Sequence, residues 1–219
     1  MSSRLTMILV LGALVALGPL TIDMYLPALP ALTADLATTS STAQLTLTGT
    51  LVGLALGQLV IGPLSDALGR RRPLLAGAAL HVAASLAITV APNVAVLGVL
   101  RVLQGVGAAA GAVIALAIIR DLYTGRAAAT MFSRLMLVMG VAPVLAPTVG
   151  GELLRITSWR GLFVALASTG CWCWWRPRGR CASRWRPNTG SPRGSARRCA
   201  PTAVCCTTGR SSDWCWSRA

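Results

Sequence analysis

The chain has 219 residues, of which 54% are hydrophobic and only 12% are charged. Its 20 basic residues are all arginine and outnumber 6 acidic ones, which gives a net charge of +14. A soluble domain carries about 25% charged residues, so this composition excludes an ordinary soluble enzyme and an acidic disordered chain. The polar surface that usually accompanies a nucleic-acid-binding patch is missing. We therefore predict an integral membrane protein that is not an enzyme, embedded in the lipid bilayer and without a nucleic-acid partner.

Apolar stretches follow one another through the first 170 residues. A bilayer core about 30 Å thick needs about 20 apolar residues in a helix. Five stretches are long enough and predict membrane spans: Leu5–Pro27, Thr42–Leu64, Pro73–Val90, Val94–Ile119 and Ala129–Leu153. A sixth begins near Gly161 and stays apolar for 15 residues, to Trp175. At 1.5 Å per residue it spans about 22 Å, so we expect a truncated sixth helix.

The arginines are distributed unequally between the two sides of these spans. Two lie on one side, Arg155 and Arg160. Seven lie on the other: Arg4, Arg70, Arg71, Arg72, Arg120, Arg126 and Arg134. Because cytoplasmic loops carry the excess of Lys and Arg, we predict a cytoplasmic N-terminus.

The composition changes abruptly at Gly170. Residues 1–170 contain 34 leucines and residues 171–219 contain none, while the latter hold all 7 cysteines. We predict a transmembrane helical bundle over residues 1–170 and a disordered tail, rich in Arg, Cys and Trp, over residues 171–219. The tail has no zinc-type cysteine spacing, and a cytoplasmic position disfavours disulfides, so no metal or cofactor is expected.

The run Cys171-Trp172-Cys173-Trp174-Trp175 suggests an origin for the tail. The codons TGC TGG TGC TGG TGG CG, read two bases later, give Leu-Val-Leu-Val-Ala, which is membrane-helix sequence. We interpret the tail as a frameshift product. A natural low-complexity tail is the alternative, and its arginines would then suit weak tethering to anionic lipid or RNA.

Two charged residues lie well inside the predicted spans. Asp23 is about 6 Å from the outer end of the first span and Arg101 about 10 Å from that of the fourth, at 1.5 Å per residue. Charges at membrane depth usually face a cavity or a partner. Because a nearby Arg lowers the pKa of a carboxyl group, this pair suits a protonation switch. A static ion pair that fixes helix packing is the alternative, and the lone His81 is read as structural.

Three further segments carry patterns beyond apolarity. Gly62–Arg72 combines turn-forming glycines with Asp66 and three arginines, and is expected to form the second loop. Arg101–Gly111 has small residues that permit close helix contact. Gly140–Gly151 contains two prolines four residues apart, which are expected to bend the fifth span. A topological arginine cluster and ordinary tight packing are the simpler alternatives.

Together these segments resemble the major facilitator superfamily, in its drug/proton antiporter branch, and are most similar to the bicyclomycin-resistance type of multidrug exporter. Two positions depart from the family pattern, since Ala67 replaces a basic residue and Ala146 replaces a common glycine. The matching motifs are Asp23–Pro30, Gly62–Arg71, Leu97–Ala109, Gly140–Gly151 and Trp159-Arg160.

The resemblance implies an all-α polytopic protein of a bacterial-type inner membrane, here the N-terminal six-helix half of a major facilitator fold. It implies proton-coupled antiport of small amphipathic drugs, hence antibiotic resistance, and pairing with a second half or copy. An inactive truncated membrane protein is the alternative. The roles that the resemblance implies are proton coupling by Asp23 and Arg101; a cytoplasmic gating loop with Gly62, Asp66, Gly69, Arg70 and Arg71; and an antiporter-motif helix with Gly140, Pro143, Pro147, Gly150 and Gly151. From the residues themselves we expect a substrate cavity with the polar Tyr25 and Gln104, which are near Asp23 and Arg101, and with the adaptable Met136 and Met139. Ordinary packing is the alternative for the two methionines.

Overall fold

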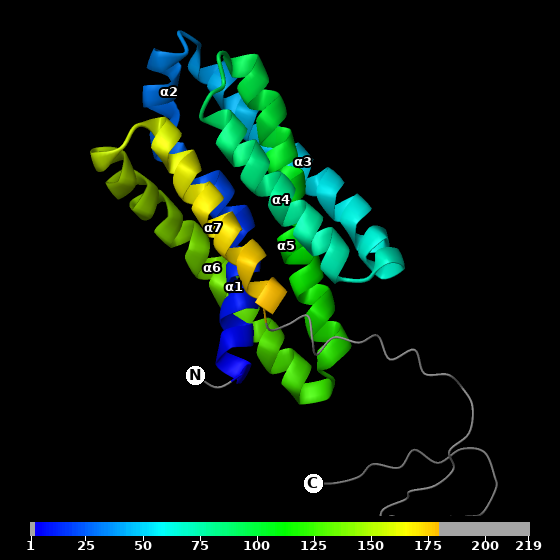
Figure 1. Ribbon diagram of the computed structural model, residues 1–219. Helices are drawn as coiled ribbons and strands as arrows, with labels where there is room; N and C mark the ends of the chain where they lie inside the picture. The colour runs from blue at the N-terminus through cyan, green and yellow to red at the C-terminus, as the bar shows by residue number, and fades with distance from the viewer. Residues whose placement is uncertain (1–2, 180–219) are drawn as a thin grey trace, which may run out of the picture. The chain divides into compact units, whose positions relative to one another are not determined.

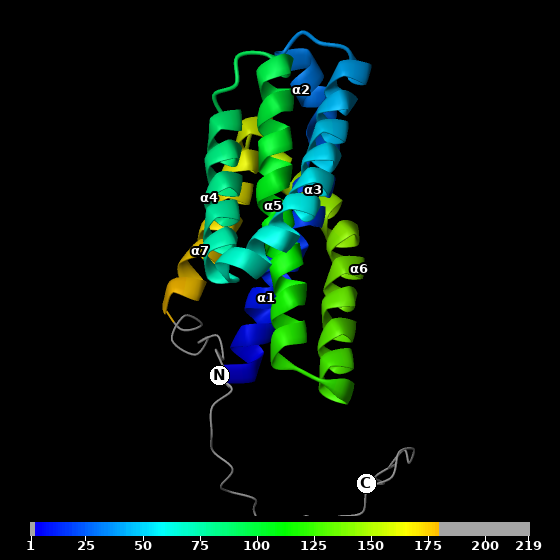
Figure 2. The ribbon, with the colours of Figure 1, turned by 90° about the vertical axis from the view of Figure 1, so that its right-hand side faces the viewer.

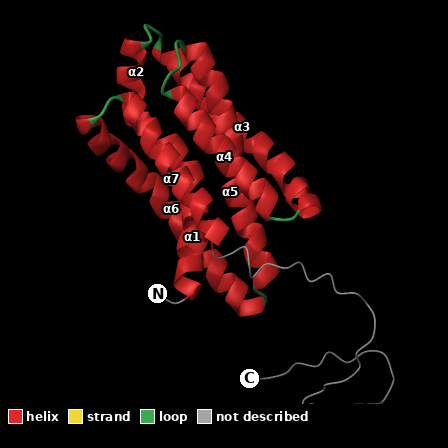
Figure 3. Cartoon of the chain, viewed as in Figure 1, coloured by secondary structure: helices red, strands yellow, loops and turns green. Residues whose placement is uncertain are grey.

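A computed structural model of the chain describes residues 3–179, with side chains placed for residues 8–171. Every regular element in this range is a helix, as Figures 1 and 3 show, so the predicted all-α fold is confirmed. The elements in chain order are α1 (Ser3–Asp23), the 3-10 helix η1 (Leu26–Ala28), α2 (Leu29–Asp35), α3 (Ser40–Leu68), α4 (Arg71–Ile88), α5 (Val94–Leu122), α6 (Gly125–Ile156) and α7 (Trp159–Gly179).

The first span is broken rather than continuous. Helix α1 ends at Asp23, and Met24 and Tyr25 separate it from η1 and α2. Pro27 and Pro30 each stand in the first turn of a new helix, where a missing N–H costs nothing. The prediction of one helix over Leu5–Pro27 is therefore wrong at its outer end, because these prolines begin new helical turns.

The second loop is shorter than predicted. Helix α3 continues to Leu68 with Pro63 inside it, so Gly62 and Asp66 lie on a helix and not in a loop. Only Gly69 and Arg70 separate α3 from α4. Gly69 has a φ of 80°, a conformation that glycine adopts without steric cost. The loop prediction is corrected to this two-residue turn.

Side-chain caps begin two of the long helices. The Thr39 hydroxyl accepts a hydrogen bond from the Thr42 N–H at 3.2 Å and starts α3. The Asn93 side chain accepts one from the Val96 N–H at 2.9 Å and starts α5. Each cap satisfies an N–H that has no partner inside the helix.

By length and apolarity, four segments among the described residues can cross a membrane: Ile8–Asp35, Ser40–Leu68, Val94–Leu122 and Gly125–Ile156. Helix α4 has 18 residues but opens with Arg71 and Arg72. Helix α7 has 21 residues and runs to Gly179, beyond the Trp175 at which its apolar stretch ends.

Helix α7 therefore includes residues 171–179, the first nine residues of the predicted tail. Extending an existing helix costs far less than starting one, so α7 continues past the change in composition. The predictions of disorder and of a frameshift for residues 180–219 lie outside the described part.

Helix α5 is the common neighbour of α1, α3 and α4. Figure 2 shows it running between α3 and α4. Helix α6 packs on α1, and α7 packs on α4. Residues on α5 are therefore placed to contact three other helices.

Two apolar clusters are separated by a polar layer along α1 and α5. The first includes Leu14 and Ile114, and the second includes Tyr25 and Leu97. Polar side chains with no solvent exposure lie between these two clusters on α1 and α5, and α4 contributes two more. The members of this layer are Thr21, His81, Ser85, Arg101 and Gln104.

Close contact between α3 and α5 depends on Gly105. A Cβ atom there would overlap the main-chain carbonyl of Thr50 and lie 3.0 Å from the main-chain nitrogen of Leu54. Both obstacles are backbone atoms, which cannot move aside as a side-chain end does. Glycine therefore sets the separation of these two helices.

We predict that Gly105→Ala lowers the free energy of unfolding by about 1–3 kcal/mol, because the added methyl group forces α3 and α5 apart. Gly98 on the same helix has open space where a Cβ would lie. Gly98→Ala should therefore be neutral or stabilise by about 0.5–1 kcal/mol. SDS titration in mixed micelles, followed by circular dichroism, measures both, and equal effects would contradict the contact.

Candidate functional site

The polar layer is centred on Arg101, whose side chain is completely buried. Its Nη1 donates to the main-chain carbonyl of Thr21 at 3.0 Å and to Oε1 of Gln104 at 2.9 Å. Its Nε and Nη2 are buried without a hydrogen-bond partner in the described part of the chain. A positive charge is thus held inside the bundle by neutral acceptors alone.

Aromatic rings supply further stabilisation of this charge. The guanidinium carbon lies 4.2 Å from the centre of the Tyr25 ring and 5.5 Å from that of Phe163. Such cation–π contacts are worth about 2 kcal/mol when desolvated. The Tyr25 hydroxyl in turn shares a hydrogen bond of 2.9 Å with the Thr46 hydroxyl on α3.

The break in α1 provides the carbonyl that Arg101 binds. The last carbonyls of a helix lack an intrahelical donor, and Thr21 lies in the last turn of α1. Arg101 occupies that acceptor, so it caps the C-terminal end of α1. A cation at this end also interacts favourably with the helix dipole.

Gln104 connects Arg101 to α4. It lies three residues after Arg101 and therefore on the same face of α5. Its Nε2 donates to the Ser85 hydroxyl at 2.8 Å, and that hydroxyl donates to the His81 carbonyl at 2.7 Å. The His81 Nδ1 lies 3.3 Å from the Gln104 carbonyl. Side chains and carbonyls of α1, α4 and α5 thus form one connected network.

Asp23 is not part of this network. It is half-buried at the end of α1. The ion pairs among the described side chains are Arg70–Asp66, Arg70–Asp121, Arg155–Glu152 and Arg160–Asp35, and none involves Asp23. Arg101 instead binds the main-chain carbonyl of Thr21, which precedes Asp23 by two residues.

A second polar cluster joins α3, α4 and α5 at the end of the bundle where α3 meets α4. The Nε of Arg70 lies 3.0 Å from Asp121 Oδ2, and its Nη1 donates to the Ser65 hydroxyl at 2.7 Å and to Asp66. The hydrogen bond to Asp121 raises the pKa of Arg70 above its usual value. Arg71 is the exposed first residue of α4 and stands outside this cluster.

The four predicted cavity residues divide into two pairs. Tyr25 and Gln104 are fully buried beside Arg101. Met136 and Met139 lie on the exposed face of α6, at 50% and 38% exposure. The structure therefore does not bring the two pairs into one pocket.

The antiporter-motif residues lie on α6, which continues unbroken through Pro143 and Pro147. A Cβ on Gly150 would lie 2.5 Å from the Met24 carbonyl, so this glycine lets α6 approach the break after α1. Gly140 and Gly151 have no such neighbour.

At the opposite end of the bundle from the Arg70 cluster, α7 is tied to α2. Arg160 lies 2.9 Å from Asp35 Oδ2, and the Trp159 indole N–H donates to the same oxygen at 3.0 Å. The Trp159-Arg160 pair noted in the sequence thus anchors the first turn of α7.

The sequence did not predict several residues that contact Arg101, its neighbours or Arg70: Thr21, Thr46, Ser85, Asp121 and Phe163. Hydroxyl residues inside apolar spans are a weak signal, because they also bond to their own helix. The Arg120-Asp121 pair directly after the fourth span was the clearest available hint.

Residues 9–204 match the sequence profile of the Major Facilitator Superfamily. The chain belongs to this family. It is 46% identical over 169 residues to an uncharacterised transporter of this family, YdgK, from Bacillus subtilis, a match that covers 76% of this chain and 42% of the relative. It is 39% identical over 175 residues to a chloramphenicol resistance protein of Pseudomonas aeruginosa, covering 77% and 42%. It is 34% identical over 168 residues to a bicyclomycin resistance protein homolog of Haemophilus influenzae, covering 77% and 42%.

These matches confirm the family that the motifs predict, and two of the relatives carry names of drug-resistance proteins. The chain spans about two fifths of the length of these curated relatives. Family membership and the apolar helices make it a multi-pass membrane protein of the bacterial inner membrane, in a family of transporters and not of enzymes.

We predict that Ser85→Ala lowers the free energy of unfolding by about 1–3 kcal/mol, because the Gln104 amide is left buried without its acceptor. Ser133 is exposed on α6 and bonds only to the carbonyl of Ala129. Ser133→Ala should change stability by less than about 0.5 kcal/mol. The same micelle titration compares them, and an unaffected Ser85→Ala protein would contradict the network.

Proposed function

We propose that the chain forms the N-terminal six-helix half of an exporter that moves small amphipathic drugs outward in exchange for protons. The observation that carries this proposal is the buried Arg101, which is held by neutral acceptors and has two nitrogens without a partner among the described residues. A charge is expensive inside a membrane protein and is retained mainly where ions or substrates pass. The drug-resistance names of the relatives support the substrate class.

In this proposal Asp23 is the group that binds and releases the proton. The ionised carboxylate is attracted to the fixed charge on Arg101, and the protonated form is not. Since Asp23 ends α1 directly before the break, its protonation changes the balance of forces at the junction between α1 and η1. Arg101 holds the same junction through the Thr21 carbonyl.

We propose that the N-terminus and the Arg70 cluster face the cytoplasm, which the excess of arginine at these helix ends supports. We propose that the turn at Gly69 and Arg70 acts as the cytoplasmic gate. Arg70 joins the ends of three helices there, so rearrangement of its bonds to Asp66 and Asp121 accompanies relative movement of those helices.

We further propose that transport requires a second six-helix unit, either another polypeptide segment or a second copy. The support is the exposed apolar surface of α3 and α6, which in a complete transporter would face a partner or the cavity, and which is otherwise left to lipid. Large side chains on these surfaces include Leu45, Leu59, Val60, Leu137, Val144 and Val149.

To test proton coupling, the chain is joined to the remaining half of the Pseudomonas aeruginosa relative and reconstituted in liposomes with an imposed pH gradient. We expect gradient-driven export of a lipophilic cationic dye. Asp23→Asn should reduce its rate by about 100-fold, the scale of a lost proton-transfer group. Asp35→Asn serves as the matched control, because Asp35 already pairs with Arg160 at the start of α7.

Full activity of Asp23→Asn would refute the role of Asp23 while leaving drug export intact. Correct membrane insertion of the joined protein without any dye export would refute the proposed function itself. The 219-residue chain is assayed alongside, and transport by the chain alone would show that a second copy suffices.

A further inference from the structure

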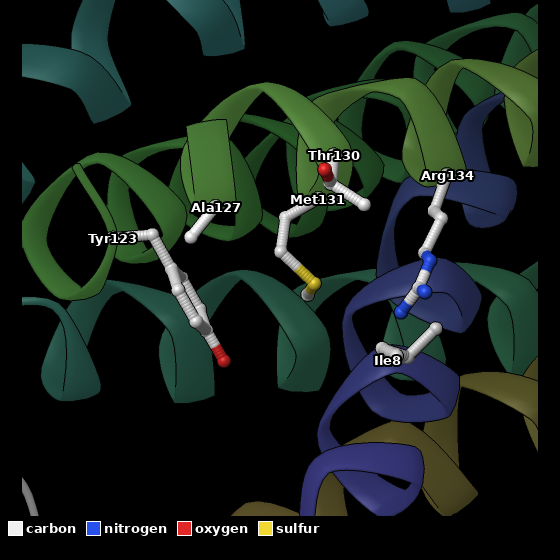
Figure 4. Close-up of a pocket in the computed structure, with 6 residues that line it drawn as sticks. All are labelled: Ile8, Tyr123, Ala127, Thr130, Met131 and Arg134. Carbon is white, nitrogen blue, oxygen red and sulfur yellow. The ribbon is translucent and has the colours of Figure 1, made fainter. Parts of the chain in front are cut away.

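A cavity of about 240 Å³ lies at the end of the bundle that holds the first turns of α6. Its lining comes from α1, from the turn after α5 and from α6. Figure 4 shows the Arg134 side chain extending from α6 toward Ile8 on α1, with Met131 lying between Tyr123 and Arg134. The lining residues are Ile8, Tyr123, Ala127, Thr130, Met131 and Arg134.

The cavity combines an apolar wall with three polar groups. Ile8, Ala127 and Met131 supply the wall. The Arg134 guanidinium and the Tyr123 phenol supply hydrogen-bond donors, whereas the Thr130 hydroxyl already donates to the Arg126 carbonyl at 3.0 Å. Pockets that enclose a drug-sized molecule measure about 300–1,000 Å³, so this cavity suits a smaller group, such as a headgroup with the start of its chains.

Arg134 has no counter-ion among the described side chains. Asp66 and Asp121 bind Arg70, Asp35 binds Arg160, and Glu152 binds Arg155. Asp23 is at the other end of α1 from Ile8. The charge on Arg134 is therefore available to an anion from outside the bundle.

Helix α6 has 32 residues, about 48 Å, which is longer than the bilayer core of about 30 Å, so its first turns extend beyond that core. Arg134 lies nine residues into α6, about 13 Å along the helix axis. Side chains on a helix tilt toward its N-terminus, so the guanidinium reaches back toward the membrane surface at that end. Arg120 and Arg126 add positive charge on either side of Tyr123. Anionic lipid headgroups collect at such basic, cytoplasm-facing ends of helices.

We propose that this cavity binds one anionic phospholipid, with the phosphate on Arg134, a hydrogen bond from Tyr123, and the upper acyl chain against Ile8 and Met131. This site is separate from the Arg101 layer and does not depend on the proposed transport. Its occupant would hold α1 and α6 together at the membrane surface.

The test uses the full 219-residue chain, purified in a nonionic detergent and titrated by native mass spectrometry with phosphatidylglycerol and with phosphatidylcholine. The unaltered chain should bind phosphatidylglycerol about fivefold more tightly, as expected for one arginine near the surface. Arg134→Gln should abolish this preference and Arg134→Lys should retain most of it. Arg126→Gln, which removes a neighbouring charge that does not line the cavity, should keep it.

A second pair of variants tests the cavity without altering charge. Ala127→Trp fills it and should weaken binding of both lipids, whereas Ala129→Trp, on the exposed surface of the same helix, should not. Helical circular dichroism confirms that each variant is folded. Unchanged lipid preference in Arg134→Gln, an equal loss in Arg126→Gln, or displacement of the lipid by millimolar inorganic phosphate would each overturn the proposal, the last in favour of a free-anion site.

Discussion

The central constraint on this bundle is the guanidinium of Arg101, which lies inside it and pairs with no carboxylate among the side chains that the structure places. Burying an unpaired charge costs several kcal/mol unless the surroundings compensate for it. Here a main-chain carbonyl, a glutamine oxygen and two aromatic rings provide the compensation. These partners come from α1, the break after it, α5 and α7, so the charge requires three helices to be held in register. The apolar clusters on either side exclude water from this layer, which strengthens each polar contact.

Small residues make this arrangement sterically feasible. Gly105 brings α5 against α3, and Gly150 brings α6 against the break after α1. Gly107 in turn brings α5 against His81 on α4, and Gly111 brings α5 against Leu14 on α1. Without these contacts α5 would stand too far away for Gln104 to reach Ser85 or for Arg101 to reach Thr21. Membrane helices gain little from burying apolar surface against each other, since lipid is equally apolar, so packing and hydrogen bonds of this kind decide their association.

Much of the fold follows from the sequence, because apolar runs of about 20 residues have one stable form in a bilayer. The long helices begin within a few residues of their predicted positions, and the family follows from ordered motifs such as Asp23–Pro30. The failures have local causes. Pro27 and Pro30 start new turns where a continuous span was expected, and helix α3 runs on through Pro63. In the site, Arg101 and Gln104 were found because polar groups stand out in apolar segments. Ser85 and Phe163 were not, because their role depends on which helices become neighbours.

The break after Asp23 has a consequence for how α1 can move. If α1 extended smoothly into the following turn, the amide of Tyr25 would take the Thr21 oxygen, as regular helical bonding dictates. A carbonyl oxygen has two lone pairs, so it could accept from this amide and from Arg101 together. In the broken form no helical amide shares this oxygen. Winding of a single turn would thus weaken the hold of α1 on the buried charge, and unwinding would restore it.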